Sequence, residues 1–385
     1  MSTDRPLLSQ HKRIVVKIGS NVLASREWGL HEARIGQIAD EVAALRYAGR
    51  DVVIVSSGAV LCGSEKMGFT AAPTTLVLKQ AAAAIGQSRL MWAYEKSFSA
   101  LGITCAQVLL TREDIASRRR FISARNTLIA LLAHRVLPIV NENDTVAVEE
   151  IKLGDNDHLA ALVAHLVDAT LLILLSDVDG LYSSDPRRDP QATCIPQVTK
   201  ITPEIEAMAG GPGKRGGTGG MSSKVAAAKS AAAYGIATLI LNGVSPKQIG
   251  LALAAGSDRS VGTLFLPNAS RRSDKKQWIA QLPPRGEVVI DAGAATAITR
   301  GGKSLLPSGV REVRGRFQPG DAIRCLTLEG VELARGLTNY GSSEMIRIAG
   351  ARSSVIADIL GDKPADEVIH RNNMVRSDPP LDGGR

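Results

Sequence analysis

Three short polar side chains stand side by side at the start of an apolar stretch with helical spacing. Residues 154–164 read GDNDHLAALVA, so Asp155, Asn156 and Asp157 precede a run of leucine, alanine and valine. Asp and Asn are good N-caps because their side-chain oxygens accept hydrogen bonds from the free N–H groups of a first helical turn. One cap needs only one such residue. The surplus side chains are therefore candidates for binding or catalysis.

The segment before this helix is dense in carboxylates and amides. Residues 141–157 read NENDTVAVEEIKLGDND, and no His or Cys accompanies the acids. Mixed amides and carboxylates suit an amino acid, because its ammonium group needs acceptors and its carboxylate needs donors. A metal site is the alternative interpretation, but Lys152 lies among the carboxylates. We therefore predict no metal ligands from the protein.

Two lysines lie close to glycines in settings typical of anion binding. Lys17 ends a strand-like run in KIGS (17–20), and Lys224 opens an Ala-rich helix in GGTGGMSSKVAAAK (216–229). Glycine exposes backbone N–H groups, a helix N-terminus favours phosphate, and the ammonium adds charge. SSGA (56–59) repeats the arrangement with hydroxyl groups. The alternatives are a lysine that reaches solvent from a strand end and an ordinary Ser-capped helix.

The elements that position these residues alternate between strands and helices. Short aliphatic, β-branched runs are separated by longer segments with helical periodicity. The expected strands lie within 13–20, 51–58, 103–110, 136–144, 169–177 and 237–243, and the helices within 30–47, 76–98, 123–134, 157–167 and 221–234. Strands that are apolar on both faces and alternate with helices predict an α/β fold, with a mainly parallel sheet sandwiched by helices.

Ligands of such sheets gather at the carboxyl ends of the strands. Here those ends carry Lys17, Ser57 with Gly58, residues 141–144, and Ser176 with Asp177. The sequence therefore predicts a site at this edge of the sheet.

A second, smaller region follows the α/β region. Residues 268–282 are rich in charge and end before a Pro pair, which is typical of a linker. The segments 287–298, 304–315, 321–330 and 331–340 read as short extended runs divided by Gly, Pro and Asp, which predicts a small β-rich domain. We expect domains at 1–267 and 283–362, and a C-terminal tail at 363–385.

The composition narrows the class of protein. Aromatic residues make up 3% of the chain, so stacking surfaces for single-stranded nucleic acid are scarce, and the net charge of +8 fits anionic ligands, nucleic acid or simple solubility. The apolar runs are far shorter than the roughly 20 residues of a membrane span, so we expect no membrane partner. Four scattered cysteines without CxxC spacing argue for a reducing, cytoplasmic location.

The ordered motifs resemble the glutamate 5-kinases of the amino acid kinase family. The segments that carry the resemblance run from Lys12 to about Phe265: VVKIGSNVL, VIVSSGAV, AAIGQSRL, QVLLTRED, SARNTL, VNENDTVAVEEIKLGDNDHLAALVA, LLSDVDGLYSSDPR, GTGGMSSK and VGTLF. SLLPSGV, GRFQPGDAIRCLTLEG and ARGLTNYGSSEMIRIAG resemble the PUA domain that many bacterial members append. Ser20 and Ser223 stand where Thr is common in the family.

The resemblance implies transfer of the ATP γ-phosphoryl group to the side-chain carboxylate of L-glutamate. The product is L-glutamate 5-phosphate, and the reaction is the first step of proline biosynthesis. Lys17 and Lys224 are expected to stabilise the transferring phosphoryl group, with Asp157 holding both ammonium groups. Another amino acid kinase, or an RNA-binding protein acting through the PUA domain, is the alternative.

The resemblance also assigns contacts and partners. Glutamate is expected to contact Ser57, Asp144 and Asn156. The expected ATP contacts are Lys17, Ser176, Asp177, Thr218, Gly219, Gly220, Met221, Ser222, Ser223 and Lys224. Mg²⁺ is expected on the phosphates, held mainly by ATP and water. Further expectations are proline as a feedback inhibitor, a homo-oligomer (dimer or tetramer), and RNA as a possible PUA ligand.

Overall fold

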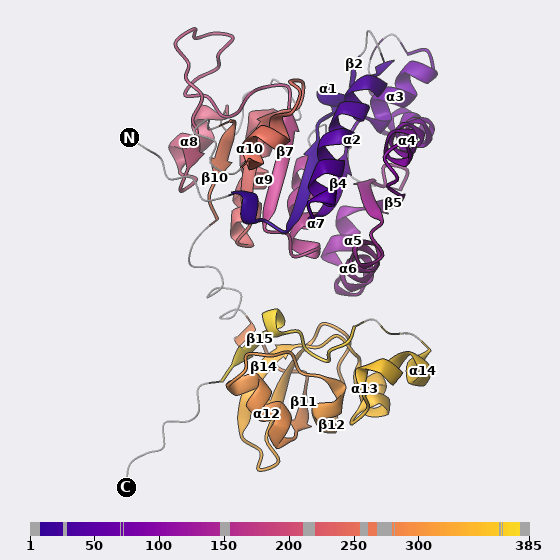
Figure 1. The fold of residues 1–385 in the computed structure, drawn as a ribbon, viewed down its shortest axis with the longest axis vertical. Coiled ribbons are helices and arrows are strands. Elements are labelled where there is room, and N and C mark those ends of the chain that lie inside the picture. The colour runs from indigo at the N-terminus through magenta and orange to yellow at the C-terminus, as the bar shows by residue number, and fades with distance from the viewer. Residues whose placement is uncertain are drawn as a thin grey trace. The chain divides into compact units, whose positions relative to one another are not determined.

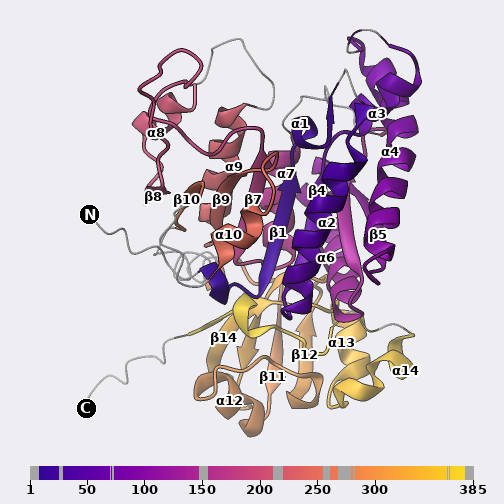
Figure 2. The same ribbon diagram turned by 45° about the horizontal axis from the view of Figure 1, so that its top comes forward.

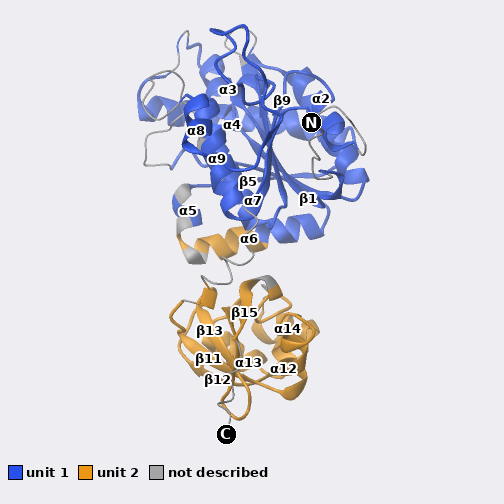
Figure 3. Cartoon of the chain, turned by 90° about the vertical axis from the view of Figure 1, so that its left-hand side faces the viewer, with its two compact units in different colours: residues 1–116, 127–269 blue, residues 117–126, 270–385 orange. Residues whose placement is uncertain are grey.

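The computed structural model divides the chain into two compact units. It describes residues 8–25, 29–69, 71, 73–146, 155–210, 220–254, 261–267, 279–280, 282–361, 363 and 365–377. One unit comprises residues 1–116 and 127–269, and the other comprises residues 117–126 and 270–385 (Figure 3). In the part of the chain that is described, no helix has the length and apolarity to cross a membrane.

An eight-stranded sheet organises the first unit. Its order is β5-β6-β4-β1-β7-β9-β10-β8, and only the β10–β9 pairing is antiparallel. The strands are β1 (Arg13–Ile18), β4 (Asp51–Ser56), β5 (Cys105–Leu110), β6 (Leu137–Glu142), β7 (Leu171–Ser176), β8 (Gln197–Val198), β9 (Ala237–Asn242) and β10 (Thr263–Phe265). A separate short pairing joins β2 (Ala24–Ser25) to β3 (Gly29–Leu30).

Helices cover both faces of this sheet. The helices of the first unit are η1 (Leu8–Gln10), α1 (Ser20–Leu23), α2 (Glu32–Tyr47), α3 (Ala59–Lys66), α4 (Leu76–Ser99), α5 (Arg112–Ala116), α7 (Asp155–Leu166), α8 (Pro203–Met208), α9 (Met221–Ala233) and α10 (Gln248–Leu253), and the residues of α6 (Arg118–Ala133) are divided between the two units. Helices α2 and α10 lie on one face, while α7 and α9 lie on the other (Figures 1 and 2). The predicted fold class, a mainly parallel sheet between helices, is confirmed.

The strand β1 shows how the sequence divides the two faces. Ile14, Val16 and Ile18 pack into the core with residues of α2, α4 and α10. Because side chains alternate along a strand, Val15 and Lys17 point to the opposite face, where α7 contacts β1. A cationic side chain is thereby directed towards α7, near the carboxyl end of the central strand.

Helices α3 and α4 approach each other through glycines. A Cβ atom on Gly63 would lie 1.7 Å from the carbonyl oxygen of Ala82, and one on Gly86 would lie 1.9 Å from that of Ala59. Neither distance is possible for a real side chain, so the backbones of the two helices are in direct contact. This contact fixes the start of α3, which follows the SSGA turn, against the middle of α4.

The second unit has a sheet of its own. Its order is β12-β11-β13-β14-β15, and within it only β11 and β13 pair in parallel. The strands are β11 (Gly286–Ile290), β12 (Val310–Gly315), β13 (Ala322–Leu326), β14 (Glu332–Leu337) and β15 (Met374–Arg376). The helices are α12 (Ala292–Thr299), η2 (Pro307–Gly309), α13 (Ser342–Ile348), η3 (Ser353–Val355), α14 (Ile356–Leu360) and η4 (Arg371–Asn373).

One predicted extended segment of this unit was wrong. Residues 287–298 divide into β11 and the helix α12, because Asp291 caps the helix by accepting a hydrogen bond from the backbone N–H of Ala294 at 2.8 Å. Half of the eight residues after the cap are alanine, which has the highest helix propensity. The β-rich character of the rest is confirmed.

The domain boundaries 1–267, 268–282, 283–362 and 363–385 stay a prediction. Residues 268–278 and 281 of the expected linker lie outside the described residues, as do 378–385 of the expected tail. Within the expected tail, however, β15 pairs with β14, and Val368, Ile369 and Met374 are buried in the core of the second unit. The second sheet therefore continues past residue 362.

Candidate active site

Two lysines share one carboxylate at the carboxyl end of the first sheet. The Nζ atom of Lys17 lies 2.6 Å from Oδ1 of Asp157, and Nζ of Lys224 lies 3.3 Å from Oδ2. Lys17, Asp157 and Lys224 come from β1, α7 and α9, and are 4%, 0% and 5% exposed. Such burial of charges is expensive unless they are paired, so the cluster is a candidate catalytic centre and not a surface ion pair.

Burial and the neighbouring charges shift the pKa values of Lys17 and Asp157. Burial is the largest influence on Lys17 and lowers its pKa, Asp157 opposes this, and the charge of Lys224 lowers it further. Burial alone would raise the pKa of Asp157, but the charges of Lys17 and Lys224 and the hydrogen bonds that it accepts outweigh burial and lower it. Asp157 is therefore a carboxylate at neutral pH. Strongly perturbed groups of this kind are enriched at functional sites.

The first turn of α9 contributes a hydroxyl group to the same carboxylate. The Oγ atom of Ser223 lies 2.6 Å from Oδ2 of Asp157 and 2.8 Å from the carbonyl oxygen of Gly220, the N-cap residue of α9. Met221 is half-buried and Ser222 is exposed in this turn. Thr218 and Gly219, two of the predicted ATP contacts, lie outside the described residues.

A network of amides lies next to the lysine cluster. Nδ2 of Asn156 is within hydrogen-bond distance of three acceptors: the carbonyl oxygen of Ser56 (2.9 Å), Oγ of Ser57 (3.0 Å) and Oδ1 of Asn141 (2.9 Å). Oδ1 of Asn156 is buried, and the described residues offer it no hydrogen-bond partner. Asp144 is half-buried in the turn after β6.

The remaining predicted contacts follow β7. Ser176 is buried, and its hydroxyl donates to Oδ1 of Asp177 at 3.2 Å. Asn21 of α1 donates to Oδ2 of Asp177 at 3.0 Å. Burial would raise the pKa of Asp177, but the hydrogen bonds from Asn21 and Ser176 and the charge of Lys224 lower it. Four neighbouring strands, β6, β4, β1 and β7, thus supply or precede the described candidate residues other than those of α9.

Sequence reasoning did not single out every residue of this edge. Asn141 bonds to Asn156, Asn21 bonds to Asp177, and Gln87 bonds to Asn141, yet none of the three was predicted as a contact. All three do lie in the quoted motifs: Asn141 in NEND, Gln87 in AAIGQSRL and Asn21 in VVKIGSNVL. The motifs were the signal, but only the folded chain shows which polar atoms meet.

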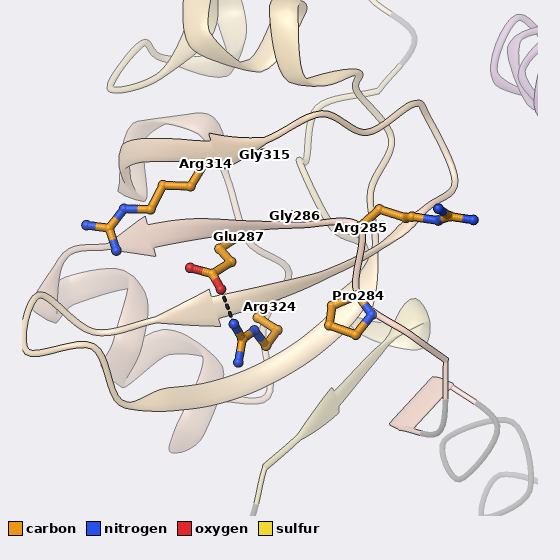
Figure 4. Close-up of a pocket in the computed structure, with 7 residues that line it drawn as sticks. All are labelled: Pro284, Arg285, Gly286, Glu287, Arg314, Gly315 and Arg324. Atoms are coloured by element: carbon orange, nitrogen blue, oxygen red, sulfur yellow. Dashed lines mark hydrogen bonds and ion pairs between the residues drawn. The ribbon is translucent and has the colours of Figure 1, made fainter.

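A separate pocket lies in the second unit. It has a volume of about 340 Å³ and is lined by Pro284, Arg285, Gly286, Glu287, Arg314, Gly315 and Arg324. Glu287 forms an ion pair with Arg324, while Arg285 points away from Arg314 (Figure 4). Arg314 pairs with Glu312 at 2.8 Å. Two of the three guanidinium groups are therefore already neutralised by carboxylates.

The chain matches two protein families. Residues 12–242 match the amino acid kinase family, and residues 286–360 match the PUA domain. The chain is 52% identical over 370 residues to a glutamate 5-kinase of Geobacter sulfurreducens, which covers 96% of this chain and 98% of that protein. Glutamate 5-kinases of Pelobacter propionicus (51% identical, 96% and 99% covered) and Geobacter metallireducens (52% identical, 96% and 98% covered) are similar to it as well. The chain therefore belongs to the amino acid kinase family, in which these relatives are glutamate 5-kinases.

Proposed function

We propose that this chain transfers the γ-phosphoryl group of ATP to the side-chain carboxylate of L-glutamate. The product, L-glutamate 5-phosphate, opens proline biosynthesis. The observation that carries the proposal is the buried cluster of Lys17, Asp157 and Lys224. The proposal agrees with the relatives named glutamate 5-kinase, which match nearly the whole chain. Another amino acid kinase activity is not favoured.

The chemistry needs positioning and charge, not a base. A glutamate side chain is already ionised at neutral pH, so the nucleophile requires no proton removal. Phosphoryl transfer is then accelerated by aligning the two substrates and by stabilising negative charge on the transferring oxygens. We assign the charge stabilisation to Lys17 and Lys224, and the orientation of both ammonium groups to Asp157.

We assign the amino-acid subsite to Ser57, Asp144 and Asn156. Support comes from the buried Oδ1 atom of Asn156, for which the described residues provide no donor. A buried acceptor without a partner is costly, and an ammonium group would satisfy it. Asp144 supplies negative charge in the neighbouring turn.

We assign the nucleotide subsite to Lys17, Ser176, Asp177 and residues 218–224. Support comes from the helix α9, whose N-terminus opens at Gly220 beside the lysine cluster, because helix N-termini favour phosphate. The described residues contain no group of three His, Cys, Asp or Glu side chains able to hold a metal. We propose that Mg²⁺ is held mainly by the phosphates and water, where it would neutralise phosphate charge.

Trapping the acyl phosphate with hydroxylamine tests the proposed reaction. The full chain is incubated with ATP, Mg²⁺ and glutamate, aspartate or N-acetylglutamate, and the hydroxamate is measured. Glutamate is expected to give hydroxamate well above the other two acceptors. A higher yield with aspartate or N-acetylglutamate would contradict the proposal.

We propose that the PUA domain is a second binding module with RNA as its candidate ligand. Support comes from Arg285, which is exposed at the rim of the pocket in Figure 4. Comparing RNA affinity of the full chain with that of a chain ending at Leu266 tests this. Equal RNA affinity of the full and the shortened chain would show that the PUA domain does not contribute to RNA binding.

We also propose a cytoplasmic homo-oligomer, a dimer or tetramer, that proline inhibits. Support for assembly comes from Leu78, Ile85 and Trp92 of α4, which are seven residues apart and are 40%, 42% and 56% exposed. Sedimentation of the wild type and of W92A measures assembly, and a monomeric wild type would contradict it. Competition between proline and glutamate measures the inhibition.

A further inference from the structure

Helix α4 carries two polar side chains on an otherwise apolar inner face. Gln87 and Tyr94 are seven residues apart and so lie on the same side of the helix. Their buried neighbours on α4 are Ala83, Gly86, Leu90, Ala93 and Phe98. Tyr94 is itself completely buried, and Gln87 is half-buried. Polar groups in such places are normally hydrogen-bonded, so their partners indicate their role.

Both side chains meet the ends of strands that carry the site. Ile54 of β4 and Ile139 of β6 belong to the core that includes α4. Ser56 and Asn141 stand two residues further along these strands and share the same face. The Tyr94 hydroxyl lies 2.9 Å from Oγ of Ser56, and Oε1 of Gln87 accepts from Nδ2 of Asn141 at 2.7 Å.

The direction of the Gln87 hydrogen bond is fixed by the backbone. The N–H of Glu142 donates to Oδ1 of Asn141 at 2.9 Å, so Oδ1 is the acceptor end of this amide. The opposite end of Asn141, its NH₂ group, must then face Gln87, which can satisfy it only with an acceptor. Gln87 therefore stabilises one of the two possible orientations of the Asn141 amide.

The orientation of the Asn141 amide also determines the orientation of the Asn156 amide. Oδ1 of Asn141 also accepts from Nδ2 of Asn156 at 2.9 Å. Because Nδ2 of Asn156 faces Asn141, Ser56 and Ser57, its Oδ1 atom is turned away from them and remains buried without a partner among the described residues. A reversed Asn141 would offer an NH₂ group to Nδ2, and two donors cannot bond.

We infer that Gln87 is a positioning residue of the glutamate subsite. Through Asn141 it holds Asn156 with the carbonyl oxygen available to the ammonium group of the substrate. The inference rests on the proposed function, since it concerns the amino-acid subsite of that reaction. Gly86 makes it possible, because only a residue without Cβ lets α4 lie against Ala59 at this height.

Kinetic constants of Q87M and S88M test this role. Methionine keeps the length of glutamine and removes the strong acceptor, while S88M places the same side chain on Ser88, the exposed next residue of the helix. Q87M is expected to raise KM for glutamate roughly tenfold, the effect of one buried hydrogen bond, while KM for ATP changes less than twofold. S88M is expected to match the wild type, because its side chain lies in solvent.

Two further variants separate positioning from general damage. Q87E keeps an acceptor for Asn141 and is expected to recover most of the affinity for glutamate that Q87M loses. The double variant Q87M/N141A is expected to match N141A alone, because Gln87 acts through Asn141. Melting temperatures of all variants monitor folding, and a purely structural role would lower them without separating the two KM values.

Two results would overturn the inference. One is an unchanged glutamate KM in Q87M, and the other is an effect of Q87M that adds fully to that of N141A. If Q87M does not fold, the glutamate KM of Q87E is compared with that of the wild type. Loss of glutamate affinity in a folded Q87E would contradict the acceptor role of Gln87. A wild type that gives no hydroxamate from glutamate would instead contradict the proposed function.

Discussion

Oδ1 of Asp157 lies 2.6 Å from Nζ of Lys17, and both side chains are almost fully shielded from solvent. The other oxygen of the same carboxylate pairs with Lys224. Two ammonium groups therefore share one carboxylate, and the buried cluster carries an excess positive charge. A negatively charged phosphoryl group would offset this excess positive charge, so the site is electrostatically matched to the group that it is proposed to transfer.

Removing either lysine should reduce turnover far more than glutamate affinity. K17A and K224A each delete one of the two charges that we propose to act on the transferring phosphoryl group, and kcat is expected to fall by roughly 100-fold or more. Lys229 lies on the same helix as Lys224, but it is 62% exposed and pairs with Glu206, so K229A serves as the control. Near-normal turnover in K17A or K224A would refute the assignment.

Replacing Asp157 should reduce both turnover and stability. D157N keeps the shape of the side chain but leaves two buried ammonium groups without their counter-ion, which costs about 3–5 kcal/mol of unfolding free energy. Asp51 pairs with Arg13 at a half-exposed position, so D51N should cost no more than about 1 kcal/mol. Denaturant unfolding measures both. Equal losses would show that burial of the cluster is unimportant.

Asn156 and Asp157 are adjacent but should have different kinetic effects. N156A removes a contact of the amino-acid subsite and is expected to raise KM for glutamate chiefly. D157N disturbs the lysines and is expected to lower kcat chiefly. Initial rates over a range of glutamate concentrations separate the two effects. If both variants behave alike, the pair has a shared structural role instead.

The pH dependence should reveal the buried lysine. Burial lowers the pKa of Lys17 below its ordinary value of 10.5, so the ammonium loses its proton at a lower pH than an exposed lysine does. Since the proposed role of Lys17 requires the charged form, kcat/KM is expected to fall as pH rises through this lowered pKa. K17R stays charged throughout and should lose this alkaline limb. A wild-type profile that stays flat up to the ordinary lysine pKa of 10.5 would contradict the prediction.

Glycine at the crossing of α3 and α4 should be essential for stability. In G86A the new methyl group would meet the backbone of Ala59, and the forced separation should cost at least about 2 kcal/mol. Gly36 of α2 has nothing within 4 Å of its Cβ position, so G36A is a matched control that should be neutral or slightly stabilising. Thermal unfolding measures both, and equal stability would mean that the helices can separate freely.

The sequence predicted what depends on local pattern. Apolar runs of six residues gave the strands, and the position of Lys17 near the end of such a run placed it at the carboxyl edge. The extended prediction for 287–298 was wrong at α12, because the Asp291 cap and the alanines that follow it form a helix. The roles of all the site residues, including Thr218 and Gly219 outside the described part of the chain, stay predictions.

Contacts between polar residues that are distant along the chain could not be predicted from the sequence. Gln87 and Asn141 are separated by 54 positions, and their hydrogen bond exists because α4 crosses the ends of β4 and β6. No local spacing reports such a crossing. The same holds for Asn21 and Asp177, which are 156 positions apart.

The first turn of α7 also fixes the distance between two parts of the candidate site. Asn156 bonds to the Ser57 hydroxyl after β4 and to the Asn141 amide near the end of β6, while its immediate neighbour Asp157 bonds to the two lysines. Neighbouring residues of a helix are offset by only about 1.5 Å along its axis and by about 100° around it. A rigid helical turn thus fixes the distance between Asn156, the proposed contact of the amino-acid end, and Asp157, which holds the two lysines. We therefore predict that an acceptor one methylene shorter, bound at Asn156, would not bring its carboxylate to the lysines that Asp157 holds, so the spacing of these two consecutive residues favours one chain length.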